Sequence, residues 1–201
     1  MPNISVTNIP TILKQNPYET QWELLESKVE KKHPFFGNVF TEHGCKYEDT
    51  ALMLYSKLTN NEYKSQINFK HKDYTWISGR VDAITTNNCL VEIKCPYRKK
   101  FKDLLTEDDV PKHYWIQCQV YMEMCNIEIC HYVEFFIEPN SPTDGSVGQI
   151  SYVPICRNRK WWSENIEKIV KFYEEMNYWI EKKSLDTHPI RVTENEWSAK
   201  I

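Results

Sequence analysis

Glycine is scarce in this chain of 201 residues, which has only five. That count excludes collagen-like sequence and glycine-rich linkers. No run of about 18 apolar residues occurs, so no transmembrane helix is expected. The first 15 residues lack a basic segment followed by a long apolar core. We therefore expect an intracellular protein that is not secreted, in the cytoplasm or the nucleus.

A paired-cysteine motif is also lacking. The seven cysteines are at positions 45, 89, 95, 118, 125, 130 and 156, and no two form C-x-x-C. This spacing does not favour a structural zinc or a redox pair, and it fits a reducing compartment. An excess of positive charge is missing too, since the formal net charge is −3. A surface that binds nucleic acid would therefore have to be local.

The composition, 41% hydrophobic and 26% charged, is that of one globular domain. Hydrophobic periodicity predicts helices over about 19–31, 44–59, 109–126 and 163–183, and strands over 62–71, 74–85, 89–95, 129–138 and 149–155. We expect an α/β fold with a central mixed sheet flanked by helices. Residues 1–201 form a single domain with a core over about 41–156, and 157–201 supply a helix and a loosely packed tail.

Two helix starts follow from the sequence. Asp109, before Val110-Pro111, is expected to cap one helix, and Ser163 is expected to open the last one. The helix over 44–59 carries an apolar stripe, with Glu48 at its edge. The stripe consists of Tyr47, Ala51, Leu54, Tyr55 and Leu58.

The informative segment is a predicted hairpin whose turn is centred near Asn87. This register puts Asp82 directly opposite Glu92, and cross-strand partners lie about 4.5–5.5 Å apart. Two carboxylates at that distance repel each other unless a cation lies between them, and Mg²⁺ or Mn²⁺ takes such oxygen ligands. Lys94 shares the face of Glu92 and points into the same site, where it could hold an attacking water.

A plainer interpretation of the same hairpin is a solvated polar face that carries surface ion pairs. The apolar residues Leu90, Val91 and Ile93 count against it, because they indicate a largely buried strand. Charges in a buried strand need a reason to be there.

Four motifs occur in order along the chain. They are Gly44-x-x-Tyr47-Glu48-x-x-Ala51, Gly79-x-x-Asp82, Glu92-x-Lys94 followed by Pro96, and Gln117-x-x-x-Tyr121. Together they resemble the lambda-exonuclease-like, YqaJ-type viral recombinase (alkaline exonuclease) family of the PD-(D/E)XK nuclease superfamily. The resemblance spans about residues 12–138.

The resemblance implies a restriction-endonuclease-like fold and a role for each motif residue. Asp82, Glu92 and the backbone carbonyl of Ile93 would hold one or two Mg²⁺ ions, for which Mn²⁺ could substitute. Glu48 would reach the same site, and Lys94 would position the attacking water and stabilise developing charge. Without the motif, Glu48 would be taken as a solvated helix residue.

Gln117 and Tyr121 lie on one helix face, because they are four residues apart. By the resemblance, Gln117 would contact a catalytic residue or the DNA backbone, and Tyr121 is a candidate DNA contact. The alternative is an ordinary polar patch on a packed helix.

Basic residues after the predicted site strand are candidate phosphate contacts. They are Arg98, Lys99, Lys100 and Lys102. A second basic group lies at positions 157, 159 and 160, next to two tryptophans.

The resemblance points to a Mg²⁺-dependent exodeoxyribonuclease that digests linear double-stranded DNA ends in recombination or repair. Alternatives are an endonuclease on the same fold and an inactive DNA-binding or scaffold protein. The implied partners are DNA, a single-strand annealing protein and, in a homotrimer, two further copies. No arginine precedes Arg80, so the resemblance assigns no arginine of this sequence to the grip on a 5′-phosphate, and the substitutes that the sequence offers are Lys14, Lys28, Lys31, Lys32 and His33.

Overall fold

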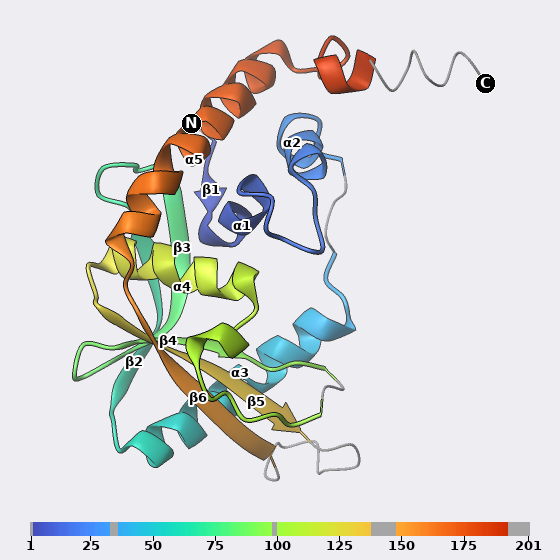
Figure 1. Cartoon of the computed structure of the whole chain (residues 1–201). Coiled ribbons are helices and arrows are strands. Elements are labelled where there is room, and N and C mark those ends of the chain that lie inside the picture. The colour runs from blue at the N-terminus through green and yellow to red at the C-terminus, as the bar shows by residue number, and fades with distance from the viewer. Residues whose placement is uncertain (1, 33–35, 98–99, 138–147, 193–201) are drawn as a thin grey trace.

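A six-stranded sheet forms the centre of the molecule (Figure 1). The computed structural model describes residues 2–32, 36–97, 100–137 and 148–192. The strands are β1 (Ile4–Ser5), β2 (Tyr63–Lys70), β3 (Ile77–Thr85), β4 (Leu90–Lys94), β5 (Ile129–Ile137) and β6 (Gly148–Cys156). The α-helices are α1 (Ile9–Ile12), α2 (Gln21–Val29), α3 (Val39–Thr59), α4 (Lys112–Cys125) and α5 (Arg159–Lys182). The five expected strands are therefore all present.

The sheet is mixed, which confirms the expected fold class. Its order is β1-β3-β4-β5-β6, and β2 pairs with β3 beside this path. The pairs β1·β3 and β4·β5 are parallel, and β2·β3, β3·β4 and β5·β6 are antiparallel. The helix between β4 and β5 supplies the crossover that a parallel pair requires.

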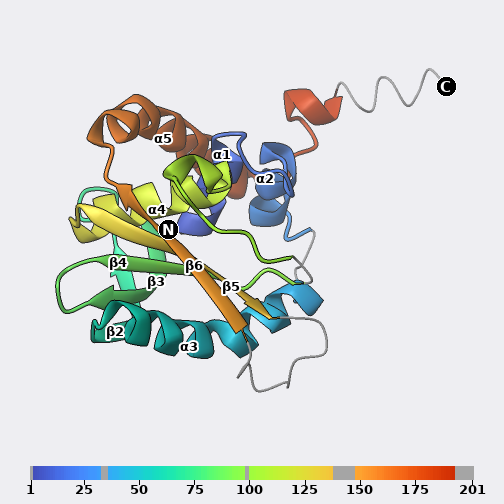
Figure 2. The ribbon, with the colours of Figure 1, turned by 60° about the horizontal axis from the view of Figure 1, so that its bottom comes forward.

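Helices cover both faces of the sheet. Figure 2 shows α3 along one face, with α4, α5 and α1 on the other. The α3 side encloses a small core around Ala51 and Tyr55, which are both fully buried. The other side encloses the larger core, to which α1, α2, α4 and α5 contribute. The strands β4, β5 and β6 alternate their side chains between these two cores.

Three helix starts differ from the sequence expectation. α3 begins at Val39 rather than near residue 44, because the Asn38 side chain accepts hydrogen bonds from two backbone N–H groups of the first turn. α5 begins at Arg159, where Asn158 and not Ser163 is the cap. α4 begins at Lys112 with no side-chain cap.

Asp109 does not cap α4, so that expectation was wrong. Its carboxylate accepts from the backbone N–H groups of Leu105 and Thr106 and closes the short 3-10 turn Glu107–Asp109 instead. The backbone N–H groups that this carboxylate reaches precede Asp109 in the chain. Asp109 therefore stabilises the connector before α4 and not α4 itself.

The predicted stripe of α3 is correct at Tyr47, Ala51 and Tyr55, which are buried. Leu58 was expected in the stripe, but it is 59% exposed. Leu52 is buried in the sheet-facing surface, one turn before Tyr55. The face that packs on the sheet is therefore shifted and ends before the last turn.

The N-terminal segment contributes structure that the sequence did not predict. Ile4 pairs with Ile77 as part of a two-residue strand, and the one-turn helix α1 is buried throughout. Elements this short have no measurable period, so the hydrophobic pattern could not reveal them.

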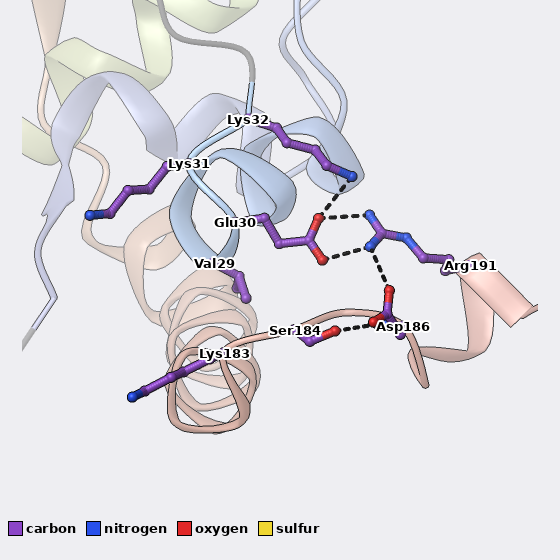
Figure 3. Close-up of a pocket in the computed structure, with 8 residues that line it drawn as sticks. All are labelled: Val29, Glu30, Lys31, Lys32, Lys183, Ser184, Asp186 and Arg191. Atoms are coloured by element: carbon purple, nitrogen blue, oxygen red, sulfur yellow. Dashed lines mark hydrogen bonds and ion pairs between the residues drawn. The ribbon is translucent and has the colours of Figure 1, made fainter.

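The segment after α5 does not pack loosely as far as residue 192. Leu185 is fully buried, and His188 lies between the rings of Trp22 and Trp179. Arg191 forms ion pairs with Glu26 and Glu30 of the α2 region, and Figure 3 shows the pair with Glu30. These contacts close one side of an open hollow of about 540 Å³ between the ends of α2 and α5. The two ends of the described chain are thereby joined.

In the described parts of the chain, no helix is both long and apolar enough to cross a bilayer.

The Arg191–Glu30 pair predicts a pH-dependent stability. The hydrogen bond that Arg191 donates to the Glu30 carboxylate lowers the pKa of Glu30 to about 2. A depressed carboxyl pKa stabilises the fold above the ordinary value, and this stabilisation is lost as the pH falls from about 4.5 to about 2. Arg191→Met should reduce the free energy of unfolding at pH 7 by roughly 1–3 kcal/mol, the usual cost of leaving a partly buried charge unpaired.

Denaturant titrations at pH 7 and at pH 2.5 measure this difference. The difference in the free energy of unfolding between wild type and Arg191→Met should be smaller at the lower pH. Arg159→Met is the matched control, because Arg159 pairs with the exposed Glu128 and should matter little. An equal gap at both pH values would contradict the assignment.

Candidate active site

The site is built where β3 and β4 separate. Their backbone pairing comprises Ala83↔Val91 and Ile84↔Leu90. One step further, the same register sets Asp82 opposite Glu92, as the sequence predicted. There the carboxylate takes the place of the backbone partner, because Ile93 N donates to Asp82 Oδ2 over 2.7 Å.

The faces of β4 separate its apolar and charged side chains as expected. Val91, Ile93 and Cys95 belong to the core beneath α3. Glu92 and Lys94 alternate with them and point to the α4 side. Glu92 is 4% exposed, so this carboxylate is buried inside the sheet rather than on a solvated hairpin.

The regular alternation of β3 breaks at Asp82. Val81 packs in the larger core on the α4 side, whereas Ala83, two residues on, packs in the core beneath α3. Across the ladder, Gln66 has a positive φ of 53° between two regular pairs. Asp82 is therefore at a local twist of the strand, and its side chain turns toward β4 instead of onto either face.

Lys94 is held against Glu92. Its Nζ lies 2.6 Å from Glu92 Oε1. Burial raises the pKa of Glu92, and the neighbouring Asp82 raises it further. Burial alone would lower the pKa of Lys94, but the two carboxylates outweigh it and raise the pKa, so Lys94 is cationic. The site is a buried cluster of two acids and one ammonium group.

Glu48 belongs to the same electrostatic cluster from the α3 side. It is half-buried, and its pKa is raised by burial and then by Asp82. The thiol of Cys95 is within electrostatic range of these groups, and burial together with Glu48 and Asp82 raises its pKa to about 12. Cys95 is thus a packing residue, since its thiol stays protonated at neutral pH.

Gln117 and Tyr121 are both buried on α4, at 7% and 5% exposure. Gln117 Oε1 is a buried acceptor without a hydrogen-bond partner in the described structure. Tyr121 donates its hydroxyl to the carbonyl of Arg80 over 3.0 Å. A Cβ at Gly79 would lie 2.7 Å from the Tyr121 ring, so only glycine fits there. Tyr121 thus serves to hold β3 against α4.

The candidate phosphate contacts are only partly visible. Arg98 and Lys99 lie outside the described residues. Lys100 and Lys102 are exposed on the connector after β4, and Lys102 Nζ lies 2.7 Å from Asp109 Oδ1.

Only Arg157 of the second basic group is buried, whereas the side chains of Arg159 and Lys160 are 60% and 84% exposed. Arg157, with its side chain 6% exposed, pairs with Glu123 and Glu128, and Arg159 pairs with Glu128 too. The neighbouring tryptophans at 161 and 162 pack against the larger core. These residues join α5 to the end of α4.

One residue of the site was missed by the sequence analysis. The ring of Tyr114, in the first turn of α4, has its centroid 4.8 Å from Lys94 Nζ. This contact depends on how α4 docks on the sheet, which no local pattern reports.

The arrangement offers oxygen donors for a hard cation. No group of three histidine, cysteine or acidic side chains within the described ranges is already gathered to hold a metal ion. The donors are the carboxylates of Asp82 and Glu92, with Glu48 within electrostatic range. Their mutual repulsion is the charge imbalance that a divalent cation relieves.

Removing the Asp82 charge should stabilise the metal-free protein. Burial raises the pKa of Asp82, so its ionised form costs stability above that pKa, and the cost vanishes as the pH falls toward the ordinary value. In EDTA at pH 8, Asp82→Asn should raise the melting temperature by roughly 2–4 °C, about 1 kcal/mol for a chain of this size.

The gain should be absent at pH 4, and thermal melts at both pH values measure it. Asp103→Asn is the control, because this exposed carboxylate should give no gain at either pH. A melting temperature of Asp82→Asn below that of wild type at pH 8 would contradict the prediction.

Comparison with known proteins is consistent with this geometry. Residues 2–128 match the YqaJ-like viral recombinase domain. The uncharacterized protein R354 of Acanthamoeba polyphaga mimivirus is 25% identical over 149 residues, which are 68% of this chain and 27% of R354. The chain thus spans about a quarter of the length of that curated relative.

Two solved structures share the fold. The alkaline exonuclease LHK-Exo of Laribacter hongkongensis has a TM-score of 0.69 at 18% identity, over 90% of both chains. A phage-related exonuclease from Haemophilus somnus has a TM-score of 0.72 at 16% identity, over 90% of this chain and 96% of that one. The family match covers well over half of this chain, which therefore belongs to the YqaJ-like viral recombinase domain family.

Proposed function

We propose that this protein is a metal-dependent deoxyribonuclease that digests linear double-stranded DNA from its ends, in recombination or repair. The observation that carries the proposal is the meeting of Asp82, Glu92 and Lys94 where β3 and β4 separate. Membership in the YqaJ-like family supports it. So does the fold shared with two exonucleases, one of which was solved in complex with dAMP.

Asp82, Glu92 and the Ile93 carbonyl would hold one or two Mg²⁺ ions, with Glu48 as a further donor and Mn²⁺ as a substitute. The fit rests on chemistry, because these are hard oxygen donors in a buried, negatively charged place. When bound, such an ion supplies Lewis acidity and lowers the pKa of a water.

Other groups of the protein orient the metal ligands, position the attacking water and stabilise the developing charge. The N–H of Ile93 fixes the direction of the Asp82 carboxylate. Lys94 presents a permanent positive charge, which orients the attacking water and stabilises the negative charge that develops at phosphorus. Gln117 supplies an acceptor for a hydrogen-bond donor in the site.

DNA would approach along the connector after β4. Lys100 and Lys102 are exposed there, directly after the strand that carries Glu92 and Lys94. Arg98 and Lys99 are proposed as part of the same surface. Contacts of this kind bind the backbone without reading sequence, and their affinity falls as salt rises.

Substitution of the site acids tests the function. Glu92→Gln or Lys94→Met should reduce cleavage of a linear duplex by at least 10²–10⁴-fold, because each removes a group that acts on the reacting atoms. Duplexes labelled at either 5′ end, with and without Mg²⁺, measure cleavage and its polarity. For Glu92→Gln, folding and DNA binding, followed by circular dichroism and fluorescence anisotropy, should stay close to wild type, whereas Lys94→Met should be less stable because it leaves the buried Glu92 carboxylate without its ammonium partner.

Asp49→Asn is the matched control, since this exposed carboxylate is next to Glu48 in α3 and should leave cleavage unchanged. Cleavage by Glu92→Gln at the wild-type rate would refute the assignment. Cutting of covalently closed circles would favour an endonuclease. A wild-type protein without any metal-dependent cleavage would favour the non-catalytic scaffold.

Two partners extend the proposal beyond the site. The family resemblance suggests a homotrimer and a single-strand annealing protein that receives the exposed strand. Sedimentation with and without DNA tests the first.

A further inference from the structure

We infer that Tyr114 is a positioning residue for Lys94, a role that rests on the proposed nuclease function. Lys94 reaches the site on a long side chain, and its ammonium is in contact with two groups. One is the carboxylate of Glu92, at 2.6 Å. The other is the face of the Tyr114 ring, whose centroid is 4.8 Å from Nζ. That distance is within the range in which an aromatic face attracts a cation.

The ring of Tyr114 also packs on a buried aromatic side chain of the sheet. Tyr114 stacks on Tyr132, with centroids 5.9 Å apart and planes inclined by 26°. Tyr132 is fully buried and donates its hydroxyl to Glu134 over 2.8 Å. Tyr132 pairs with Glu92 across the β4·β5 ladder. The ring of Tyr114 and the ammonium of Lys94 are therefore both positioned by the same two strands.

A second aromatic side chain, that of His113, also contacts the Tyr114 ring. His113 lies beside Tyr114 with centroids 4.0 Å apart, and Tyr18 meets His113 edge-on at 5.6 Å. Tyr114 is therefore packed between Tyr132 of the sheet and His113 of its own helix, and Tyr18 of the N-terminal segment packs on His113 in turn. A ring held in this way loses little entropy when it contacts a cation.

The two partners of Lys94 differ in what else they must do. Glu92 is also a proposed metal ligand, and a carboxylate that holds a cation attracts a neighbouring ammonium less strongly. The face of Tyr114 attracts the ammonium without accepting its proton and without competing for the metal. Tyr114 thus keeps Lys94 directed at the reacting phosphate when the Glu92 carboxylate is shared.

The first test separates positioning from DNA binding. Tyr114→Leu should lower kcat about 10- to 30-fold and leave KM for a linear duplex within twofold, because the ring acts through Lys94. Tyr114→Phe keeps the aromatic face and should stay within about threefold of wild type. Tyr178→Leu is the matched control, because Tyr178 faces Lys182 in a similar pair on the exposed side of α5; it should leave both constants unchanged.

The second test does not require activity. In protein carrying ¹³C-labelled lysine, the ring current of Tyr114 should shift the εCH₂ protons of Lys94 upfield. The signal is assigned by its disappearance in Lys94→Met. The shift should persist in Tyr114→Phe and be lost in Tyr114→Leu, with melting temperatures recorded for each variant.

The outcomes separate this inference from the proposed function. An active wild type with unchanged kcat in Tyr114→Leu overturns the positioning role alone, as does a Tyr114→Leu variant in which only KM rises. A Lys94 signal without an upfield shift overturns the contact. A wild type that never cleaves DNA, although Lys94 shows the shift, overturns the proposed function, and the role of Tyr114 falls with it.

Discussion

The hydrogen bond from Ile93 N to Asp82 is the interaction on which the site depends. It replaces a backbone pair at the point where β3 and β4 stop pairing. One contact therefore does two things. It satisfies a buried N–H group that the separating strands would otherwise leave unpaired, and it fixes the carboxylate that has turned out of the alternation of β3. The positions of Glu92 and Lys94 are fixed by the same hairpin, because it sets the register of β4 against β3.

The two-sided covering of the sheet explains how residues from distant segments share one electrostatic cluster. α3 brings Glu48 from one face, and α4 brings Tyr114 from the other. Asp82 is in the plane between them. The strong burial of Glu92 raises its pKa, and the free energy that this costs is compensated locally by Lys94. The proposed site therefore lies between the two cores of the domain.

The strands and the pairing of Asp82 with Glu92 could be predicted from the sequence, since strand alternation and a short polar turn fix the register. The placement of Glu48 required the motif, because a helix glutamate looks the same in solvent or near a site. Tyr114 could not be predicted, as its contact depends on the docking of α4. The helix starts failed at Asp109, whose carboxylate closes the turn before α4 instead, and at Ser163, because Asn158 caps α5 earlier in the chain.

The docking of Arg191 on Glu30 joins positions 161 residues apart in sequence. Contacts of such separation are slow to form, because the intervening chain must be ordered first. During synthesis, the α2 region leaves the ribosome well before Arg191 does, so it waits without this partner until the segment after α5 has emerged. The α2 region, although made earlier than α5, therefore completes its contacts only after α5 has been made.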